Sequence, residues 1–389
     1  MTLTLIRNAQ LYAPQPLGIR HILVGGDRIL WIGEEALELP VPLRAVSRIV
    51  DAAGRLTIPG LIDGHVHVTG GGGEAGFRTR VPAVPLSRFT SAGITTVVGL
   101  LGTDDVARGP GELLATLYAL REEGLNAYGY AGGYHVPPAT LTGSVRGDLV
   151  FVEALIGIGE VAISDHRSSQ PTLDELLRIA SECHVAGVMT GKAGVLHLHL
   201  GDGTRGLELV REALRTSELP PRVFNPTHVN RRRALFDEAL ELARQGSTVD
   251  ITAFPVEEGE DAYPADEALE RYHAAGAPAD RVTISSDAGG CLPCFDAEGR
   301  VTHMDVGSSG ALLETLRAAL ARGLTLETAL PAFTVNPARL LRFARKGVLA
   351  AGNDADLVVL DEQYRADTVV VRGEIHVKDR TPIRRGTFE

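Results

Sequence analysis

Strand-like segments alternate with amphipathic helical patterns through the middle of this 389-residue chain. Ile94–Leu101 precedes a helical pattern at Gly111–Glu123, Val161–Ser164 precedes one at Thr172–Cys183, and Val195–Leu200 precedes one at Gly206–Arg215. Strands that are each followed by a helix predict parallel βαβ units. About eight such units fit between residues 56 and 340, which predicts an α/β fold of the TIM-like (β/α)8 barrel type. In that fold the chemistry lies at the carboxyl ends of the strands.

Both ends of the chain have the pattern of β structure. Leu3–Leu11 and His21–Ile32 carry alternating apolar positions, and Gly-Gly-Asp at 25–27 suits a hairpin turn. Ala355–Leu360 and Thr368–Val371 are also strand-like. We therefore predict that residues 1–55 and 341–389 pack together as one small sheet domain beside a barrel of residues 56–340.

Charge and composition restrict the possible partners. Acidic residues outnumber basic ones by 49 to 38, a net charge of -11, which argues against nucleic acid or an anionic membrane as the main partner. The apolar runs are far shorter than a membrane span, and Arg7 lies where a signal peptide would need its apolar segment. Three cysteines cannot form a disulfide framework for a chain of this size. We expect a cytoplasmic protein.

Polar residues follow the predicted strands. His65 and His67 are two positions apart, so on a strand both side chains lie on one face and can reach one metal ion. Taken alone, the pair is equally compatible with two polar residues that fill a barrel. His199, His228 and Asp287, however, end three further strand-like segments. Imidazole and carboxylate groups at successive strand ends favour borderline divalent ions, zinc first.

Longer strings carry a resemblance to a known family. Residues Pro59–His67, followed by His199, His228 and Asp287, resemble the amidohydrolase superfamily, and within it the isoaspartyl dipeptidases, nearly from end to end. The other matching strings are Gly70–Gly76, Gly99–Asp104, Tyr134–Pro137, Thr142–Val145, Ala162–Ser168, Pro226–Arg231 and Gly352–Leu357. The resemblance implies a barrel with a β-sandwich built from both termini, and a homo-oligomer, an octamer in the family.

One metal-ligand position departs from that family. Its members usually carry a carboxylated lysine at the end of the fourth strand, and this group bridges two zinc ions. Here Glu160 stands at that place, and none of the three lysines, Lys192, Lys346 and Lys378, is near it in sequence. A carboxylate is also a monoanionic group with two oxygens, although its arm is shorter. We predict that Glu160 bridges two metals; a single-metal site, or a glutamate hydrogen-bonded beside it, is the alternative.

The resemblance also implies roles for the metal-binding residues. His65 and His67 would hold one ion and His199 and His228 the other, with Asp287 touching the first. Two cations lower the pKa of a shared water toward about 7. Asp287 would take that proton and pass it to the leaving amine as a general acid/base.

Substrate-binding roles follow from the charges of a β-aspartyl dipeptide. Glu74 would pair with the α-ammonium group, and Arg167 and Arg231 would grip carboxylates bidentately. Thr103 would add a hydroxyl contact. Tyr134 resembles the family tyrosine that stabilises the scissile carbonyl oxygen as it becomes an oxyanion. Without the matching strings, the two arginines would be interpreted as surface or structural ion-pair residues.

Two further features have simpler interpretations. Cys291 stands where the family usually has a substrate-contacting serine, and a thiol is a poorer hydrogen-bond donor. With Cys294 it forms C-x-x-C, but there is no second such pair for a four-thiolate zinc site, so two loop thiols are expected. His197 shares a strand face with His199 one layer deeper, which favours barrel packing over ligation.

These features together predict a metal-dependent enzyme that cleaves β-aspartyl dipeptides to aspartate and an amino acid with two divalent ions, Zn²⁺ first. A cyclic amidase similar to dihydroorotase or hydantoinase is one alternative. Glu74 argues against it, because a neutral ring needs no partner for an ammonium group. A non-catalytic assembly protein of the same fold is the other alternative.

Overall fold

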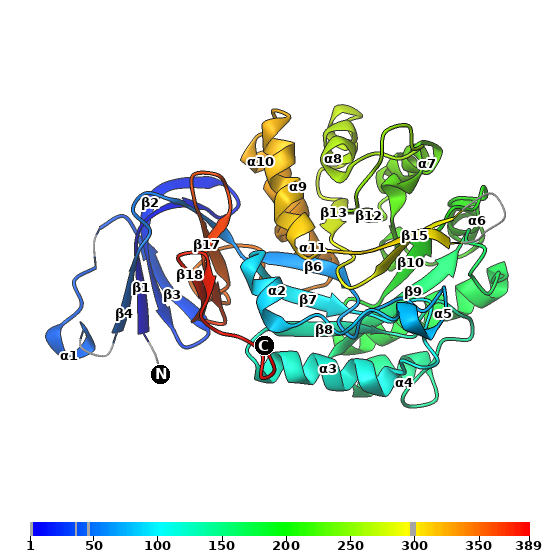
Figure 1. Cartoon of the computed structure of the whole chain (residues 1–389), viewed down its shortest axis with the longest axis horizontal. Coiled ribbons are helices and arrows are strands. Elements are labelled where there is room, and N and C mark those ends of the chain that lie inside the picture. Colours follow the sequence, from blue (N-terminus) through cyan, green and yellow to red (C-terminus); the bar gives the residue numbers. More distant parts are fainter. Residues whose placement is uncertain (1–2, 36, 45–46, 296–300) are drawn as a thin grey trace.

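The computed structural model describes residues 3–35, 37–44, 47–295 and 301–389 (Figure 1). Two bodies of structure are visible, a sheet formed by both ends of the chain and a barrel of strands and helices formed by the middle (Figure 1). This arrangement confirms the predicted fold class. The domain boundaries at residues 55/56 and 340/341 stay a prediction.

The terminal sheet joins strands from the two ends of the chain. Its strand order is β19-β18-β17-β16-β5-β1-β2-β3, and β4 pairs with β1. The N-terminal strands are β1 (Leu3–Tyr12), β2 (Pro16–Gly25), β3 (Arg28–Gly33), β4 (Ser47–Asp51) and β5 (Leu56–Pro59). The C-terminal strands are β16 (Leu357–Leu360), β17 (Ala366–Val371), β18 (Glu374–Lys378) and β19 (Thr381–Pro382). The antiparallel pairing of β5 with β16 is the link between the two ends.

Eight strands within the described ranges form the barrel. They are β6 (Leu61–Val66), β7 (Ile94–Gly99), β8 (Asn126–Ala131), β9 (Leu155–Ile163), β10 (Val195–Leu200), β11 (Phe224–Thr227), β12 (Val249–Thr252) and β13 (Val282–Ser285). β6 to β11 form one parallel sheet and β12 pairs in parallel with β13. β12 lies against β11, and β13 lies against β6, where Val66 and Ala288 form a parallel bridge. The strands therefore curl round into the predicted barrel.

Each barrel strand is followed by a helix, as the alternating pattern predicts. These helices are α2 (Leu86–Ser91), α3 (Pro110–Glu122), α4 (Val145–Phe151), α5 (Leu173–Thr190), α6 (Glu208–Thr216), α7 (Arg233–Arg244), α8 (Ala265–Ala274) and α9 (Gly310–Ala321). The remaining elements are α1 (Val41–Arg44), α10 (Leu326–Ala329), α11 (Val335–Leu340), β14 (Cys291–Phe295), β15 (Val301–Val306), and the 3₁₀ helices η1 (Phe77–Thr79), η2 (Pro221–Val223), η3 (Val229–Arg231) and η4 (Leu330–Phe333).

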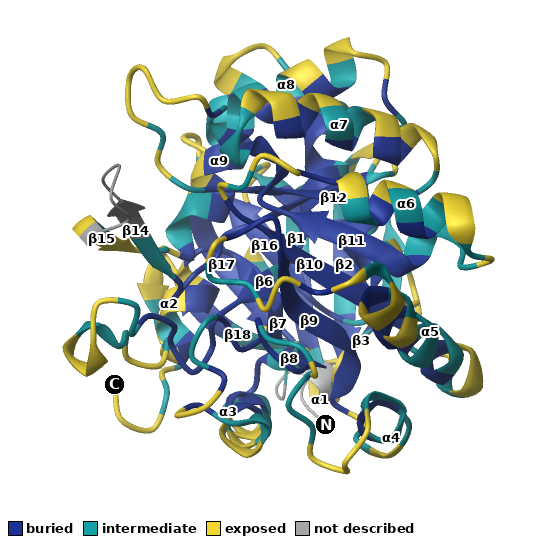
Figure 2. Ribbon diagram, turned by 90° about the vertical axis from the view of Figure 1, so that its right-hand side faces the viewer, coloured by how far each residue is buried: buried dark blue, intermediate teal, exposed yellow. Residues whose placement is uncertain are grey.

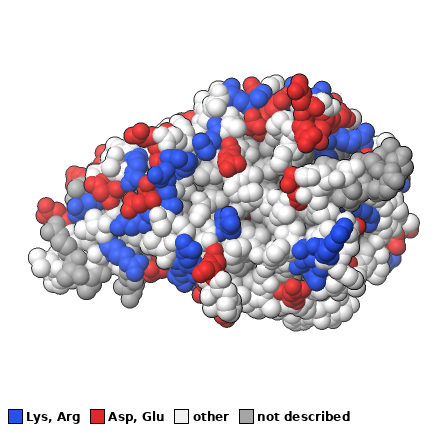
Figure 3. Space-filling view, in the orientation of Figure 1, with Lys and Arg blue, Asp and Glu red and all other residues white. Residues whose placement is uncertain are grey.

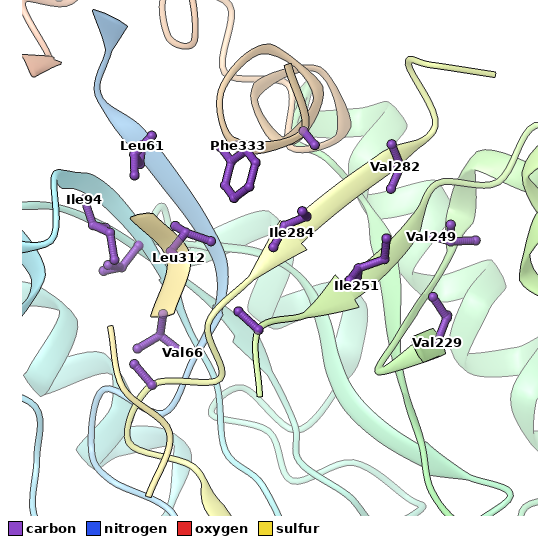
Figure 4. Packing of buried hydrophobic residues seen from close by; sticks show 14 of the residues in the cluster. Leu61, Val66, Ile94, Val229, Val249, Ile251, Val282, Ile284, Leu312 and Phe333 are labelled. Atoms are coloured by element: carbon purple, nitrogen blue, oxygen red, sulfur yellow. The ribbon is translucent and has the colours of Figure 1, made fainter. Parts of the chain in front are cut away.

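Apolar side chains between strands and helices form the core. Figure 4 shows Leu61, Ile94 and Leu312 together on one side, and Val249 and Ile251 on the other. The barrel strands are buried almost throughout, and the helices turn exposed residues outward (Figure 2). A strand enclosed on both faces needs mostly apolar residues along its length, as in β7, where two threonines are the polar side chains.

Two elements differ most from their predicted ranges. α5 continues past the predicted end at Cys183 to Thr190, because Gly187 packs closely against Gly194 inside the fold, and the helix ends at Gly191 in the left-handed conformation. Its start was predicted well, since Thr172 and Glu175 form a capping box. β9 begins at Leu155, earlier than the predicted Val161, so that Glu160 lies inside the strand.

The surface carries charges of both signs. Acidic and basic side chains are interspersed over the face of the molecule seen in Figure 3. Of the helices within the described ranges, none combines the length and the apolar character needed to cross a bilayer.

Candidate active site

The predicted metal ligands meet at the carboxyl ends of the barrel strands. All of them except His65 line one cavity of about 370 Å³ together with the predicted substrate-binding residues, and His65 is fully buried. His65 and His67 come from the end of β6, Glu160 from β9, His199 from β10, His228 from the turn after β11, and Asp287 from the turn after β13. All six are buried, with exposures of 0–6%.

Glu160 lies between the two pairs of histidines. Its Oε1 atom is 3.4 Å from His67 Nε2. Its Oε2 atom is 2.9 Å from His199 Nδ1 and 3.4 Å from His228 Nε2. Each pair forms, with Glu160, a group of three ligand atoms within 4.8 Å of one another: His65, His67 and Glu160 in one, and Glu160, His199 and His228 in the other. The shorter arm of glutamate therefore reaches both pairs.

Asp287 lies on the side of His65 and His67. Its Oδ1 atom is 3.1 Å from His67 Nε2 and 3.4 Å from His65 Nε2. Asp287 Oδ1 and His65 Nε2 are both buried atoms without a hydrogen-bond partner. Buried polar atoms nearly always have a partner, so two unpartnered atoms that face each other fit the ligands of a cation. Nitrogen and carboxylate donors suit zinc and similar divalent ions.

The electrostatics of the site also favour a cation. Burial, together with the charge of Asp287, raises the pKa of Glu160 well above its usual range, so added positive charge is needed to keep Glu160 ionised. Burial lowers the pKa of His199 to about 3 and that of His228 well below its usual range. Burial acts in the opposite sense on Asp287, but His65 and His67 hold the pKa of that carboxyl well below normal. The imidazoles of His199 and His228 are thus neutral, as metal ligation requires.

His199 is held on its far side by Asp165, a residue that the sequence did not single out. Asp165 Oδ2 is 3.0 Å from His199 Nε2, and this carboxylate also accepts hydrogen bonds from Arg167 Nε at 3.0 Å and Nη2 at 2.7 Å. Asp165 thereby joins a candidate metal ligand to a candidate substrate ligand. Its only signal in the sequence was its place between Ser164 and His166 in a matched string.

Tyr134 contacts the same histidine from inside the cavity. Its hydroxyl lies 2.8 Å from His199 Nδ1, and the guanidinium of Arg167 lies over its ring, 5.5 Å from the centroid. Burial, followed by the charge of Glu160, raises the pKa of Tyr134 well above its usual range. The phenol therefore keeps its proton and can donate a hydrogen bond.

The charged residues predicted to bind substrate also meet in this cavity. Thr103 Oγ1 donates to Glu74 Oε1 at 3.1 Å, and Arg167 Nη1 lies 3.6 Å from the same oxygen. Glu74 Oε2 is buried without a hydrogen-bond partner. Arg231 Nη1 donates to the carbonyl oxygen of Leu200 at 3.0 Å. Of the predicted substrate-binding residues, one anionic and two cationic side chains therefore line a single cavity.

Cys291, the first residue of β14, lines the same cavity. Burial, followed by the charge of Glu74, raises the pKa of its thiol to about 12, so the thiol stays protonated. Cys291 is a free cysteine; the side chain of Cys294 lies outside those described.

Residues behind the ligands hold them in place. His228 Nδ1 is 2.7 Å from Thr252 Oγ1. Asp63, which is fully buried, accepts hydrogen bonds from the backbone and the hydroxyl of Ser286, next to Asp287. His197 does lie one layer deeper than His199, as predicted, and its Nε2 atom is 2.8 Å from His65 Nδ1. Its contact with a ligand from another strand was not predicted.

Comparison with known proteins places the chain in a family. The model of the amidohydrolase family matches residues 56–376, most of the chain. The chain belongs to the amidohydrolase family. That assignment agrees with the resemblance carried by the strings around His65, His199, His228 and Asp287.

Among solved structures, this amidohydrolase is similar to the beta-aspartyl dipeptidase from Fervidobacterium islandicum AW-1. The crystal structure of that enzyme with the dipeptide beta-Asp-Leu shares 42% sequence identity, covers 98% of each chain and has a TM-score of 0.90. A second crystal structure of that enzyme shares 40% identity over 98% of each chain, with a TM-score of 0.88.

Relatives of other activities match less well. A deacetylase from Agrobacterium fabrum is 25% identical over 365 residues, which cover 87% of this chain and 78% of that protein. An imidazolonepropionase from Salinispora arenicola is 35% identical over 116 residues, 28% of this chain; the match spans only about a quarter (26%) of that protein.

Proposed function

We propose that this chain hydrolyses β-aspartyl dipeptides to aspartate and an amino acid, with two divalent cations, Zn²⁺ first. The observation that carries the proposal is the likeness over 98% of the chain to an enzyme crystallised with beta-Asp-Leu. The charges in the cavity support it, since Glu74, Arg167 and Arg231 complement an ammonium group and two carboxylates.

In this proposal each histidine pair would hold one cation. His65 and His67 would hold the first with Asp287, His199 and His228 would hold the second, and Glu160 would be the ligand that both share. The distances from Glu160 to both pairs support this assignment. When bound, such cations polarise a carbonyl oxygen and make a water acidic enough to lose its proton near neutral pH.

Asp287 acts as the general acid/base. It takes the proton of the attacking water and gives it to the nitrogen of the leaving amino acid. Its depressed pKa supports the first half of this role, because the carboxylate is ionised before the substrate binds. Its place in the cavity, with an exposure of 5%, supports contact with both the water and the scissile bond.

The substrate is oriented by its charges. Glu74 pairs with the α-ammonium group through Oε2, the oxygen that has no hydrogen-bond partner. Arg167 and Arg231 hold the carboxylates, for which the planar fork of arginine is suited. Thr103 fixes Glu74, and Cys291 borders the same space. A β-linkage adds one backbone carbon, so the distance between the charged ends selects for this substrate class.

Tyr134 stabilises the oxyanion that forms at the scissile carbonyl. Its hydroxyl lies 2.8 Å from His199 Nδ1, the nitrogen that would bind the second cation, and in this proposal the protonated phenol donates to the substrate oxygen. One donor aimed at a developing oxyanion contributes a factor of about 10²–10³ in rate.

Location and assembly complete the proposal. The scarcity of cysteine supports a cytoplasmic location, and assembly as a homo-oligomer rests on the resemblance to isoaspartyl dipeptidases.

The test is hydrolysis of β-Asp-Leu by zinc-loaded protein, and the released leucine is measured. α-Asp-Leu is the control for the linkage, and dihydroorotate is the control for a cyclic amide. The proposal predicts rapid turnover of β-Asp-Leu alone. Turnover of dihydroorotate without turnover of β-Asp-Leu would contradict it.

A further inference from the structure

The imidazole of His65 binds a cation only if the correct ring nitrogen carries the hydrogen atom. Nε2 faces the two candidate carboxylate ligands, 3.4 Å from Asp287 Oδ1 and 3.6 Å from Glu160 Oε2. Nε2 must therefore offer a lone pair, and Nδ1 must carry the hydrogen. The role of His65 as a cation ligand rests on the proposed function.

A chain of hydrogen bonds behind His65 determines which of its two ring nitrogens carries the hydrogen. It starts at the carbonyl oxygen of Thr248, which only accepts, and Asn225 Nδ2 donates to it at 2.8 Å. The amide of Asn225 is thereby oriented, so its Oδ1 atom faces His197 Nδ1 at 2.7 Å. Because an amide oxygen only accepts, His197 Nδ1 carries the hydrogen.

The donor and acceptor roles of the two His197 nitrogens in turn fix those of His65. His197 is 1% exposed and stacks on the ring of Tyr130 at a centroid distance of 5.0 Å, and burial of this degree favours the neutral ring. A neutral ring with its hydrogen on Nδ1 has a lone pair on Nε2. His65 Nδ1, which is 2.8 Å away, therefore donates to it. The hydrogen of His65 is thus on Nδ1 and its lone pair is on Nε2.

We propose that His197 is a positioning residue that, fixed by Asn225, holds His65 in the tautomer that binds a divalent cation. The contacts run from Thr248, just before β12, through Asn225 in β11 and His197 in β10 to His65 in β6. Partners of this kind orient metal-binding imidazoles and raise their basicity. His197 is not itself a ligand, because both of its ring nitrogens are engaged.

Close packing of β9 against β10 fixes the position of His197. A Cβ atom on Gly159 would lie 2.8 Å from His197 Cβ and 3.2 Å from its carbonyl oxygen, so glycine is needed where β9 passes His197. Gly159 directly precedes Glu160 in β9. The strand that carries the candidate bridging carboxylate therefore packs directly against the backbone and Cβ of His197.

The test measures zinc affinity instead of activity. Metal-free wild-type protein and the variants His197→Leu, His197→Gln and Tyr130→Phe are titrated with zinc against a coloured chelator. His197→Leu removes the acceptor and should weaken the affinity of one zinc site 10–100-fold. Glutamine can still accept from His65 and donate to Asn225, so His197→Gln should stay within about threefold of wild type if hydrogen-bond polarity is what matters. Tyr130→Phe keeps the stacked ring and is the matched control.

The outcomes separate this proposal from the proposed function. Wild-type protein that binds no zinc would overturn both. If wild type and His197→Leu bind zinc equally tightly, the role of His197 alone is overturned. The same holds if His197→Gln binds zinc as weakly as His197→Leu.

If the His197 variants fail to fold, a measurement on protein with His197 intact still tests the proposal. Proton–nitrogen correlation spectra of metal-free, ¹⁵N-histidine-labelled protein report the tautomer of each ring. The His65 signal is assigned by its loss in His65→Asn. Hydrogen on Nδ1 supports the proposal, and hydrogen on Nε2 overturns it.

Discussion

Replacing Asp165 by asparagine tests whether this buried carboxylate supports the site. Its two oxygens accept four hydrogen bonds, three from Arg167 and one from His199. Asparagine keeps the shape and one acceptor oxygen. At the other oxygen an NH₂ group would face Arg167 Nη2 and His199 Nε2, which are both donors.

The expected loss of stability follows from these contacts. Two hydrogen bonds to a charged group contribute about 1.5–3 kcal/mol each, and removing one partner of a buried ion pair costs about 3–5 kcal/mol. The Arg167 side chain is 15% exposed, and its other carboxylate neighbour, Glu74, is 3.6 Å away. Water and Glu74 therefore replace little of the interaction that Arg167 loses with Asp165. We expect Asp165→Asn to lower the free energy of unfolding by about 3–5 kcal/mol.

The effect should depend on pH in a defined direction. Burial opposes ionisation of Asp165, but its hydrogen bonds to His199 and Arg167 hold its pKa below the ordinary value of 3.8. A carboxyl with a depressed pKa stabilises the fold above its unfolded pKa and loses that contribution as pH falls through the folded value. The difference between wild type and Asp165→Asn should therefore be full at pH 7 and shrink below about pH 4.

The assay is urea unfolding of metal-free protein at pH 7 and at pH 4 and below, combined with kinetics on β-Asp-Leu. Asp202→Asn is the matched control, since its carboxyl is 63% exposed and an exposed substitution should change stability by less than about 0.5 kcal/mol. Asp165→Asn should also raise KM, because Arg167 loses its anchor. If Asp165→Asn were as stable as Asp202→Asn and had a normal KM, the reasoning would be refuted.

Three further predictions concern catalysis. Asp287→Ala should reduce kcat by several orders of magnitude without unfolding the protein, as circular dichroism would verify, because it removes the general acid/base; near-normal turnover would remove Asp287 from the mechanism. Tyr134→Phe should lower kcat by about 10²–10³-fold with a smaller change in KM, and an unchanged kcat would exclude the oxyanion role. Because Glu160 needs no carboxylation, turnover after metal reconstitution should be the same with and without added bicarbonate; a bicarbonate requirement would contradict direct bridging.

The barrel and the ligands were predictable because they depend on local pattern. Alternation along a strand puts His65 and His67 on one face, and parallel strands bring their carboxyl ends together. These two rules alone indicated that His199, His228 and Asp287 would converge with them. Glu160 was found only through the resemblance, because a single glutamate in an apolar run has no signature of its own.

The contacts behind the ligands could not be predicted, because they depend on the three-dimensional path of the chain. Asp165 reaches His199 from the turn after β9, where Ser164 has a left-handed conformation with φ of 50°. His197 was correctly placed one layer below His199, but strand alternation does not say which side chain of another strand it meets. The pairing of His197 with His65 follows from the closure of the barrel.

The most direct test of the account is a zinc titration of metal-free protein in which β-Asp-Leu turnover and bound zinc are measured together. The account predicts negligible turnover without metal and full turnover once two ions are bound per chain. Full turnover by a protein that holds no metal, or two bound ions without hydrolysis of β-Asp-Leu, would contradict it.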